Sequence, residues 1–257
     1  MDIIHALILS VVEGITEFLP VSSTGHLILS SHILKIEQTD FLKSFEIIIQ
    51  LGAILGIVFL YFRNLVKNIN IWKRILAAYI PTAVAGLIFY KTVKNYLLGN
   101  ENVVLIALFT GGIAIILLEI IHKEKDHHLE NIEEVSLKNS FLIGVFQSIS
   151  IIPGVSRAAS TIVGGLFLGL KRKTAAEFSF LLAVPTMFSA TVLDLTKTNF
   201  SFSANEYSFI AVGFLGSFVF SVITVKFFIE YIKNHNFVPF GVYRILLAAA
   251  YWYLLLR

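Results

Sequence analysis

Long apolar stretches separated by short polar ones run along most of the chain. A membrane-spanning helix needs about 20 mainly apolar residues, and six stretches meet that length. They cover residues 44–62, 75–91, 102–121, 176–194, 207–231 and 239–256. Small residues recur inside them, which predicts close helix–helix contacts. These are Gly52 and Gly56, Gly111 and Gly112, and Gly213 and Gly216.

Two further apolar stretches are interrupted at their centres. Residues 3–33 are broken at Pro20 and residues 138–170 at Pro153. Each half is about 15 residues long, or roughly 22 Å of helix, which is too short to cross about 30 Å of hydrocarbon. This pattern predicts two re-entrant hairpins, each with a polar tip that must be buried in protein or line a wet cavity.

The order of elements repeats along the chain. A hairpin followed by three spanning helices occurs in residues 1–122 and again in residues 138–257, on either side of a hydrophilic linker, 123–137. A serine follows the hairpin proline at the third position in both halves, as Ser23 and Ser156. We therefore predict one all-α integral membrane domain, residues 1–257, with six transmembrane helices, two re-entrant hairpins and an inverted-topology repeat.

Composition supports the membrane class. Of 257 residues, 56% are hydrophobic and 14% charged, and the mean hydropathy is +0.81, whereas soluble domains are about a quarter charged. The absence of cysteine excludes disulfides, thiolate metal sites and cysteine nucleophiles. No basic–aromatic stripe is present, so nucleic acid is not an expected partner. The first stretch lacks a positive leader and contains Glu13 and Glu17, so we interpret it as mature structure.

The basic residues predict the orientation, because cytoplasmic loops are enriched in Lys and Arg. One set of loops holds 11 of them: Arg63, Lys67, Lys73, Arg74, Lys123, Lys125, Lys138, Lys171, Arg172, Lys173 and Lys233. The other side holds six: Lys35, Lys43, Lys91, Lys94, Lys197 and Arg257. Both termini are therefore expected outside, with the first hairpin entering from the outer face and the second from the cytoplasm.

The linker offers a candidate metal site in His122, His127 and His128. Its neighbouring charges alternate in sign, which favours a solvated cytoplasmic linker.

The first hairpin carries an unusual density of polar residues, EGITEFLPVSSTGH at positions 13–26. Glu13 and Glu17 are four residues apart and share a helix face. In a low dielectric such a pair either shares a proton or holds a hard cation, Mg²⁺ or Ca²⁺, with water and phosphate oxygens completing the shell. The structural alternative is a pair of protonated carboxyl groups that hydrogen bond to neighbouring helices.

The residues after Pro20 suit phosphate chemistry. Ser22, Ser23 and Thr24 lie where a helix N-cap is expected, and a helix N-terminus favours an anion. Ser23 with His26 can supply a nucleophile and a base. Capping alone explains one hydroxyl, and a lone histidine on an apolar face is commonly a core residue, but neither explains the group.

The second hairpin reads PGVSRAAST at positions 153–161. A buried guanidinium stays charged and requires an anionic partner, so Arg157 predicts a phosphate site, to which Ser156, Ser160 and Thr161 add hydroxyl groups. The alternative is a salt bridge from Arg157 to Glu13 or Glu17. Arg244, with Lys226 and Glu230, is expected in a structural group near the cytoplasmic face.

These two clusters resemble the motifs of the undecaprenyl-diphosphate phosphatase family, also called the bacitracin-resistance type. That family has EGxTEFLPVSSTGH and PGxSRSGxT, and the FE…QLGAIL run at residues 45–55 is also similar, so the resemblance covers the whole chain. The second motif departs at Ala158 and Ala159, where the family usually has serine and then glycine.

The resemblance implies a metal-assisted hydrolase of the bacterial cytoplasmic (inner) membrane. It would convert undecaprenyl diphosphate to undecaprenyl phosphate and inorganic phosphate, which recycles the lipid carrier for peptidoglycan and links the family to bacitracin resistance. The implied positions are Glu13 and Glu17 for Mg²⁺ or Ca²⁺, Ser23, His26, Glu17 and Arg157 for catalysis, and Ser22, Thr24, Ser156, Arg157, Ser160 and Thr161 for substrate.

Several alternatives stay open at this stage. Direct attack by water, or by Ser22, is an alternative to attack by Ser23. A transporter or flippase for polyprenyl phosphate uses the same broken-helix design, whereas a cation channel is disfavoured because Arg157 would repel cations. Expected partners are the lipid substrate and membrane lipids, with a homodimer as one option for assembly.

Overall fold

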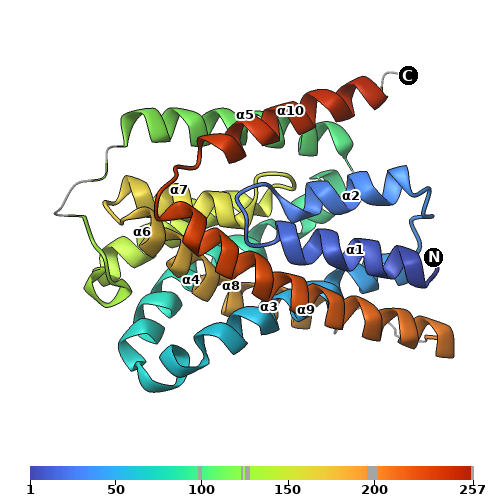
Figure 1. Ribbon diagram of the computed structural model, residues 1–257, viewed down its shortest axis with the longest axis horizontal. Helices are drawn as coiled ribbons and strands as arrows, with labels where there is room; N and C mark the ends of the chain where they lie inside the picture. Colours follow the sequence, from blue (N-terminus) through green and yellow to red (C-terminus); the bar gives the residue numbers. More distant parts are fainter. Residues whose placement is uncertain (98–99, 123, 125–127, 196–201, 256–257) are drawn as a thin grey trace.

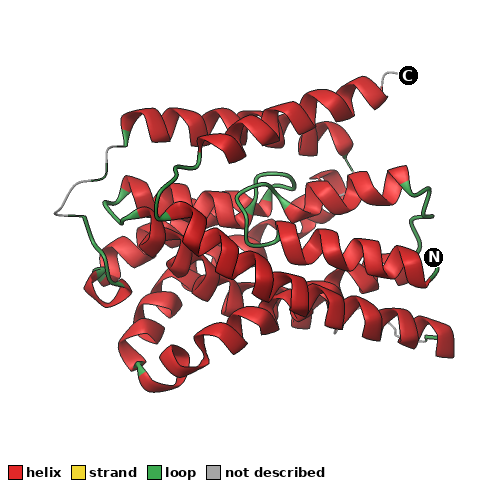
Figure 2. Ribbon diagram, in the orientation of Figure 1, coloured by secondary structure: helices red, strands yellow, loops and turns green. Residues whose placement is uncertain are grey.

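The computed structural model describes residues 1–97, 100–122, 124, 128–195 and 202–255. Within these residues the regular structure is helical, apart from one isolated bridge between Leu129 and Leu170 (Figure 2). The α-helices are α1 (Ile3–Thr16), α2 (Ser23–Ile33), α3 (Asp40–Lys67), α4 (Ile69–Thr92), α5 (Glu101–Ile121), α6 (Leu137–Ser148), α7 (Arg157–Phe167), α8 (Arg172–Leu195), α9 (Ala204–Ile232) and α10 (Val238–Leu255). A π-helix, η1 (Val93–Leu97), and two 3₁₀ helices, η2 (Ile132–Glu134) and η3 (Ile149–Ile151), complete the set.

The predicted all-α membrane fold is confirmed. Among the described residues, α3, α4, α5, α8 and α9 are long and apolar enough to cross a membrane. The sixth predicted segment, 239–256, is occupied by α10, an 18-residue helix. The chain is therefore a multi-pass membrane protein.

Both interrupted stretches form helix pairs, as predicted. Helices α1 and α2 are joined by residues 17–22, whereas α6 continues into η3 and is joined to α7 by residues 152–156. Figure 1 shows both connecting loops near the middle of the bundle's long axis, with helix ends on either side. The two polar clusters thus meet well inside the bundle.

The first helix of each hairpin packs against a spanning helix from the other half of the sequence. Helix α1 lies along α9, and α6 lies along α4. A Cβ on Gly14 would be 2.7 Å from the Phe220 Cβ, and one on Gly144 would overlap the backbone of Ala78. This reciprocal packing is the kind that an inverted repeat produces. The division into repeats 1–122 and 138–257, with linker 123–137, stays a prediction.

The small residues do bring helices close together. Gly52 and Gly56 of α3 face Ser217 and Ser221 of α9. The two serine hydroxyls donate to carbonyl oxygens of α3, at 2.7 Å to Ile49 and 3.1 Å to Ala53. Because hydrocarbon offers these hydroxyls no water, such interhelical bonds add to the close packing.

The start of α1 and the end of α10 lie towards the same end of the bundle, and the turns that follow α3, α7 and α9 lie towards the other (Figure 1). This matches the predicted arrangement of loops, while the side that faces the cytoplasm stays a prediction.

The linker is less solvated than predicted. Ile132 and Val135 are buried in the main apolar core, and Leu129 exchanges backbone hydrogen bonds with Gly169 and Lys171. Of the candidate metal ligands, His122 and His128 have ring centroids 5.1 Å apart, and His127 lies outside the described residues.

Glu119 joins three helices at the linker end of the bundle. Its carboxylate accepts from Arg172 Nε and Nη2 at 3.0 and 2.6 Å, and from the Phe237 backbone N–H at 2.9 Å. These three hydrogen bonds connect the end of α5 to the starts of α8 and α10. Glu119 is almost fully buried, so its charge depends on these donors.

Replacing Glu119 by alanine is expected to lower the free energy of unfolding by about 3 kcal/mol, because the buried Phe237 N–H loses its acceptor and Arg172 keeps only its pair with Glu124. Thermal unfolding in detergent measures this loss. The matched control is Glu230→Ala, which removes an exposed pair with Lys233 worth about 0–1 kcal/mol. Equal unfolding temperatures for the two variants would contradict the anchoring role of Glu119.

Candidate functional site

The two hairpins line a polar cavity of about 130 Å³. Side chains from both tips line it, together with one residue each from α3 and α8. The lining residues are Glu17, Ser22, Ser23, Thr24, Gln50, Ser150, Pro153, Gly154, Ser156, Arg157 and Met187. The predicted meeting of the two clusters is thereby observed.

Matching serines begin the second helix of each hairpin. Ser22 caps α2 and Ser156 caps α7, with φ of 73° and 76°, a region that non-glycine residues seldom adopt. Each hydroxyl accepts from the backbone N–H three residues on, from Gly25 at 3.4 Å and from Ala159 at 3.1 Å. The structural counterpart of Ser156 is therefore Ser22. The spacing from the hairpin prolines had paired Ser156 with Ser23, one position later.

Glu17 connects the nucleophile candidate to the arginine. The Ser23 hydroxyl donates to Glu17 Oε2, and Arg157 Nη2 donates to Glu17 Oε1 at 2.9 Å. Only 5% of the Glu17 side chain and 10% of the Arg157 side chain are exposed. The salt bridge considered as an alternative role for Arg157 is thus present, and both residues also line the cavity.

Arg157 is fixed from behind by α8. Its Nη1 donates to the carbonyl and hydroxyl oxygens of Ser179 at 2.9 and 3.3 Å, and the guanidinium carbon lies 5.5 Å from the centre of the Phe18 ring. The buried Nε has no hydrogen-bond acceptor among the described residues. One N–H donor of the guanidinium is therefore not used by the protein.

Ser179 is a contact that the sequence reasoning missed. The hydroxyl oxygen of Thr161 lies 2.5 Å from Ser179 Oγ and within 3.0 Å of two backbone carbonyl oxygens of its own helix, which accept its single hydrogen in turn. Ser160 likewise donates to the carbonyl of Ser156 at 3.0 Å. Neither Ser160 nor Thr161 is among the residues that line the cavity, whereas Ser156 and Thr24 are.

His26 lies in a different environment from the predicted one. Its Nδ1 is 2.8 Å from the Ser22 carbonyl oxygen, and its Nε2 is 2.7 Å from the Tyr243 hydroxyl. The two rings are stacked, with centroids 5.5 Å apart. The predicted pairing of Ser23 with His26 has no hydrogen bond here, and the group that accepts from Ser23 is Glu17.

Glu13 is buried directly behind the cavity residues. It is 0% exposed, and neither carboxylate oxygen has a hydrogen-bond donor among the described residues. The Glu17 carboxyl group is close enough for the two acids to share a proton, and Glu46 and Arg157 also lie nearby. A buried carboxylate without donors requires a proton or a cation.

These features fit a divalent cation held by Glu13 and Glu17. The unpartnered oxygens of Glu13 are the observation that supports it. The described residues contain no group of three or more candidate ligands, but Mg²⁺ commonly uses only one or two carboxylates and completes its shell with waters and phosphate oxygens. Mg²⁺ or Ca²⁺ at this pair stays a prediction.

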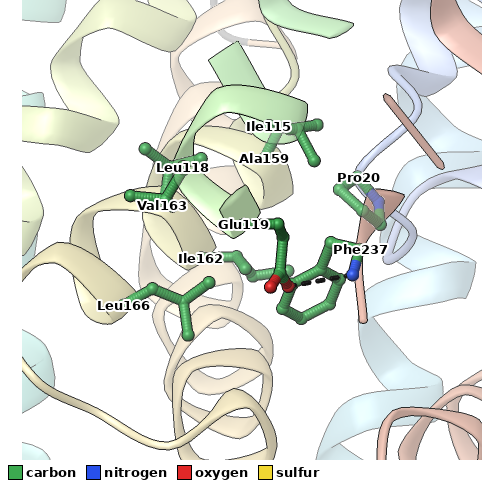
Figure 3. A pocket seen from close by; sticks show the side chains of 9 residues that line it. All are labelled: Pro20, Ile115, Leu118, Glu119, Ala159, Ile162, Val163, Leu166 and Phe237. Atoms are coloured by element: carbon green, nitrogen blue, oxygen red, sulfur yellow. Dashed lines mark hydrogen bonds between the residues drawn. The ribbon is translucent and has the colours of Figure 1, made fainter. Parts of the chain in front are cut away.

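A second and much smaller cavity, of about 10 Å³, lies next to the first hairpin tip and is almost wholly apolar (Figure 3). Pro20, Ile115 and Phe237 are among its lining residues, and its one charged group, Glu119, is bonded to the Phe237 N–H. A phosphate group finds no donor there. The polar cavity is therefore the candidate site.

Comparison with known proteins agrees with this geometry. A protein-family model described as "Bacitracin resistance protein BacA" matches residues 6–250. The undecaprenyl-diphosphatase of Aquifex aeolicus (strain VF5) is 54% identical over 247 residues, which are 96% of each chain. That of Sulfurihydrogenibium sp. (strain YO3AOP1) is 50% identical over 98% of this chain and 100% of its own, and that of Wolinella succinogenes is 51% identical over 99% of each. On these grounds the chain belongs to the bacitracin resistance protein BacA family.

Proposed function

We propose that this protein is an integral membrane phosphatase that hydrolyses undecaprenyl diphosphate to undecaprenyl phosphate and inorganic phosphate. The observation that carries the proposal is the alignment of Ser23, Glu17 and Arg157 along one polar cavity inside the bundle. The relatives named above are undecaprenyl-diphosphatases, and this chain is similar to each of them over nearly their full length. The product would return to peptidoglycan and cell-wall synthesis, which fits a link to bacitracin resistance.

The first chemical step uses groups that are already in contact. Ser23 Oγ attacks the terminal phosphorus, its proton passes to Glu17, and the bond from that phosphorus to the bridging oxygen breaks. The leaving group is undecaprenyl phosphate, whose charge needs no added proton. Arg157 binds oxygens of the transferred phosphoryl group and stabilises the charge that develops there.

The second step regenerates the serine. Glu17 first releases the serine proton to solvent and then takes a proton from a water molecule that attacks the phosphorus of the phosphoserine. The bond from that phosphorus to Ser23 Oγ breaks, Glu17 returns its proton to Oγ, and inorganic phosphate is released. A divalent cation bound at Glu13 and Glu17 would neutralise phosphate charge as a Lewis acid. His26, with its ring between the Ser22 carbonyl and Tyr243, would orient the start of α2, and its predicted role as a proton shuttle requires movement from this position.

The cavity is expected to face the outer side of the cytoplasmic membrane, with both termini outside. The distribution of Lys and Arg among the loops supports this orientation. The prenyl tail would lie among the lipids and helices while the diphosphate enters the cavity. A homodimer stays one option for assembly.

Phosphate release from C55 and C15 prenyl diphosphates, by purified protein in detergent, tests the proposal. We expect release that stops with a chelator and returns with added Mg²⁺ or Ca²⁺. A polyprenyl-phosphate transporter or flippase has no measurable transport without a sealed bilayer, so the assay separates the two functions. Phosphate release that no chelator affects would remove the metal from the mechanism, and no release at all would favour the transporter.

A further inference from the structure

Arg244 of α10 is the largest fully buried side chain in the described residues, with 0% of its surface exposed. It was expected near the cytoplasmic face with Lys226 and Glu230. Instead Glu230 pairs with Lys233, and the Arg244 guanidinium lies between the two hairpin tips.

All five N–H donors of this guanidinium are used. Every acceptor is a backbone carbonyl oxygen. Nε donates to Leu108 at 3.2 Å, and Nη1 donates to Pro20 at 3.3 Å and to Val155 at 3.0 Å. Nη2 donates to Ala107 and to Gly154, each at 2.9 Å. One side chain thus joins the first hairpin tip, the second hairpin tip and α5.

Three of these hydrogen bonds go to carbonyl groups that have no helical hydrogen-bond partner. Pro20, Gly154 and Val155 lie in non-helical backbone inside the bundle, where an unpaired carbonyl is costly. No carboxylate of the described residues forms an ion pair with Arg244, so the groups that stabilise its charge are the five carbonyl dipoles. Lysine has three donors on a single nitrogen and cannot reproduce this geometry.

Helix α5 is shaped to accept the side chain. A Cβ added to Gly111 would lie 3.0 Å from Arg244 Cζ and overlap Nη2. At the next residue the backbones of α5 and α10 lie close together, since a Cβ on Gly112 would be 2.7 Å from the Gly241 carbonyl oxygen. Gly111 therefore leaves the space that the guanidinium occupies.

We propose that Arg244 is a positioning residue that holds the two hairpin tips in the register the reaction needs. Its bond to Pro20 lies three residues after Glu17, and its bond to Val155 lies two residues before Arg157. Arg244 therefore holds the backbone next to Glu17 and the backbone next to Arg157 at a fixed distance from each other. This role rests on the proposed phosphatase function, but the structural link between the tips is independent of it.

Loss of this link should reduce turnover more than substrate binding. A displacement of about 1 Å between reacting groups costs on the order of 100-fold in rate. Arg244→Ala and Arg244→Lys are therefore expected to lower kcat by about 100-fold with KM changed by less than about 3-fold. Gly111→Ala, which keeps Arg244 but fills its space, should give the same pattern. Gly86→Ala is the matched control, because nothing lies within 4 Å of its added Cβ.

A second measurement reports on the tips without any catalysis. The chain has no cysteine, so Thr24→Cys and Ser150→Cys place one thiol on each hairpin at the cavity wall. The rate at which a short bifunctional thiol reagent joins them is expected to change at least about 3-fold in the Arg244 and Gly111 variants. It should stay constant in the Gly86 control.

The two measurements separate the outcomes. Altered cross-linking with lowered kcat supports the proposal. Unaltered cross-linking in both the Arg244→Ala and Gly111→Ala proteins overturns it, whatever the activity, and so does wild-type kcat in both. If Arg244→Ala fails to fold, Gly111→Ala decides the matter alone. A wild-type protein that releases no phosphate but shows altered cross-linking in the variants would refute the phosphatase function and keep the link.

Discussion

Replacing Arg157 by alanine is expected to lower phosphate release by about 1,000-fold or more. The guanidinium lines the cavity, bonds Glu17 at 2.9 Å and keeps its Nε free of protein acceptors, so it is placed to bind a phosphoryl group. Arginines that stabilise the charge of a transferred phosphoryl group contribute about 10³–10⁵ in rate. Single-turnover phosphate release from prenyl diphosphate in detergent measures the loss.

Two variants accompany this measurement. Arg63→Ala removes an exposed arginine from α3 and should leave turnover unchanged. Arg157→Lys keeps the charge but loses the planar fork, so its rate should fall between those of the wild type and Arg157→Ala. Near-normal turnover in a folded Arg157→Ala protein, as judged by its thermal unfolding, would refute the assigned role.

Replacing Ser23 by alanine is expected to abolish the covalent route and to reduce turnover by at least about 1,000-fold. The reason is that Ser23 Oγ donates to Glu17, whereas the other tip hydroxyl, Ser22 Oγ, accepts the cap hydrogen bond from Gly25 N–H. Only the first of these hydroxyls is paired with a base. Rapid acid quenching of wild-type protein with ³²P-labelled substrate should trap phosphate on position 23.

Ser22→Ala is the matched control for this prediction. It removes a helix cap worth about 1 kcal/mol but no nucleophile, so turnover should fall by less than about 10-fold. If Ser23→Ala retains substantial turnover and no phosphoserine is trapped, water attacks directly. A trapped phosphate on position 22 would exchange the roles of the two serines.

The hairpins were predictable because polar side chains and non-helical backbone are tolerated inside a membrane in few arrangements. Residues 13–26 and 153–161 place carboxylates, hydroxyls and an arginine inside stretches that are otherwise hydrocarbon-like, and a proline interrupts each stretch. Such groups must face one another or a wet cavity. A salt bridge from Arg157 to Glu13 or Glu17 was the alternative to a phosphate site, and the structure contains the bond to Glu17, 140 positions away.

Contacts of side chains with distant partners could not be predicted in the same way. His26 is bonded to Tyr243 and Arg157 to Ser179, and nothing in the local sequence of either residue specifies its partner. Arg244 is the clearest case, because its five acceptors are backbone carbonyls, which every residue possesses. An arginine in an apolar stretch predicts that the side chain has buried partners, but it does not predict which loops supply them.

The packing of α1 on α9 has a consequence for biosynthesis. The Gly14 backbone rests against Ser217 and Phe220, so the first hairpin meets its partner helix only after roughly 200 further residues have been made. At ~5–20 residues per second, that interval is about 10–40 s. Throughout it, Glu13 and Glu17 are in the nascent chain without the groove that later buries them. The first hairpin is thus made well before the helix that completes its packing, and its two carboxylates need other surroundings during that interval.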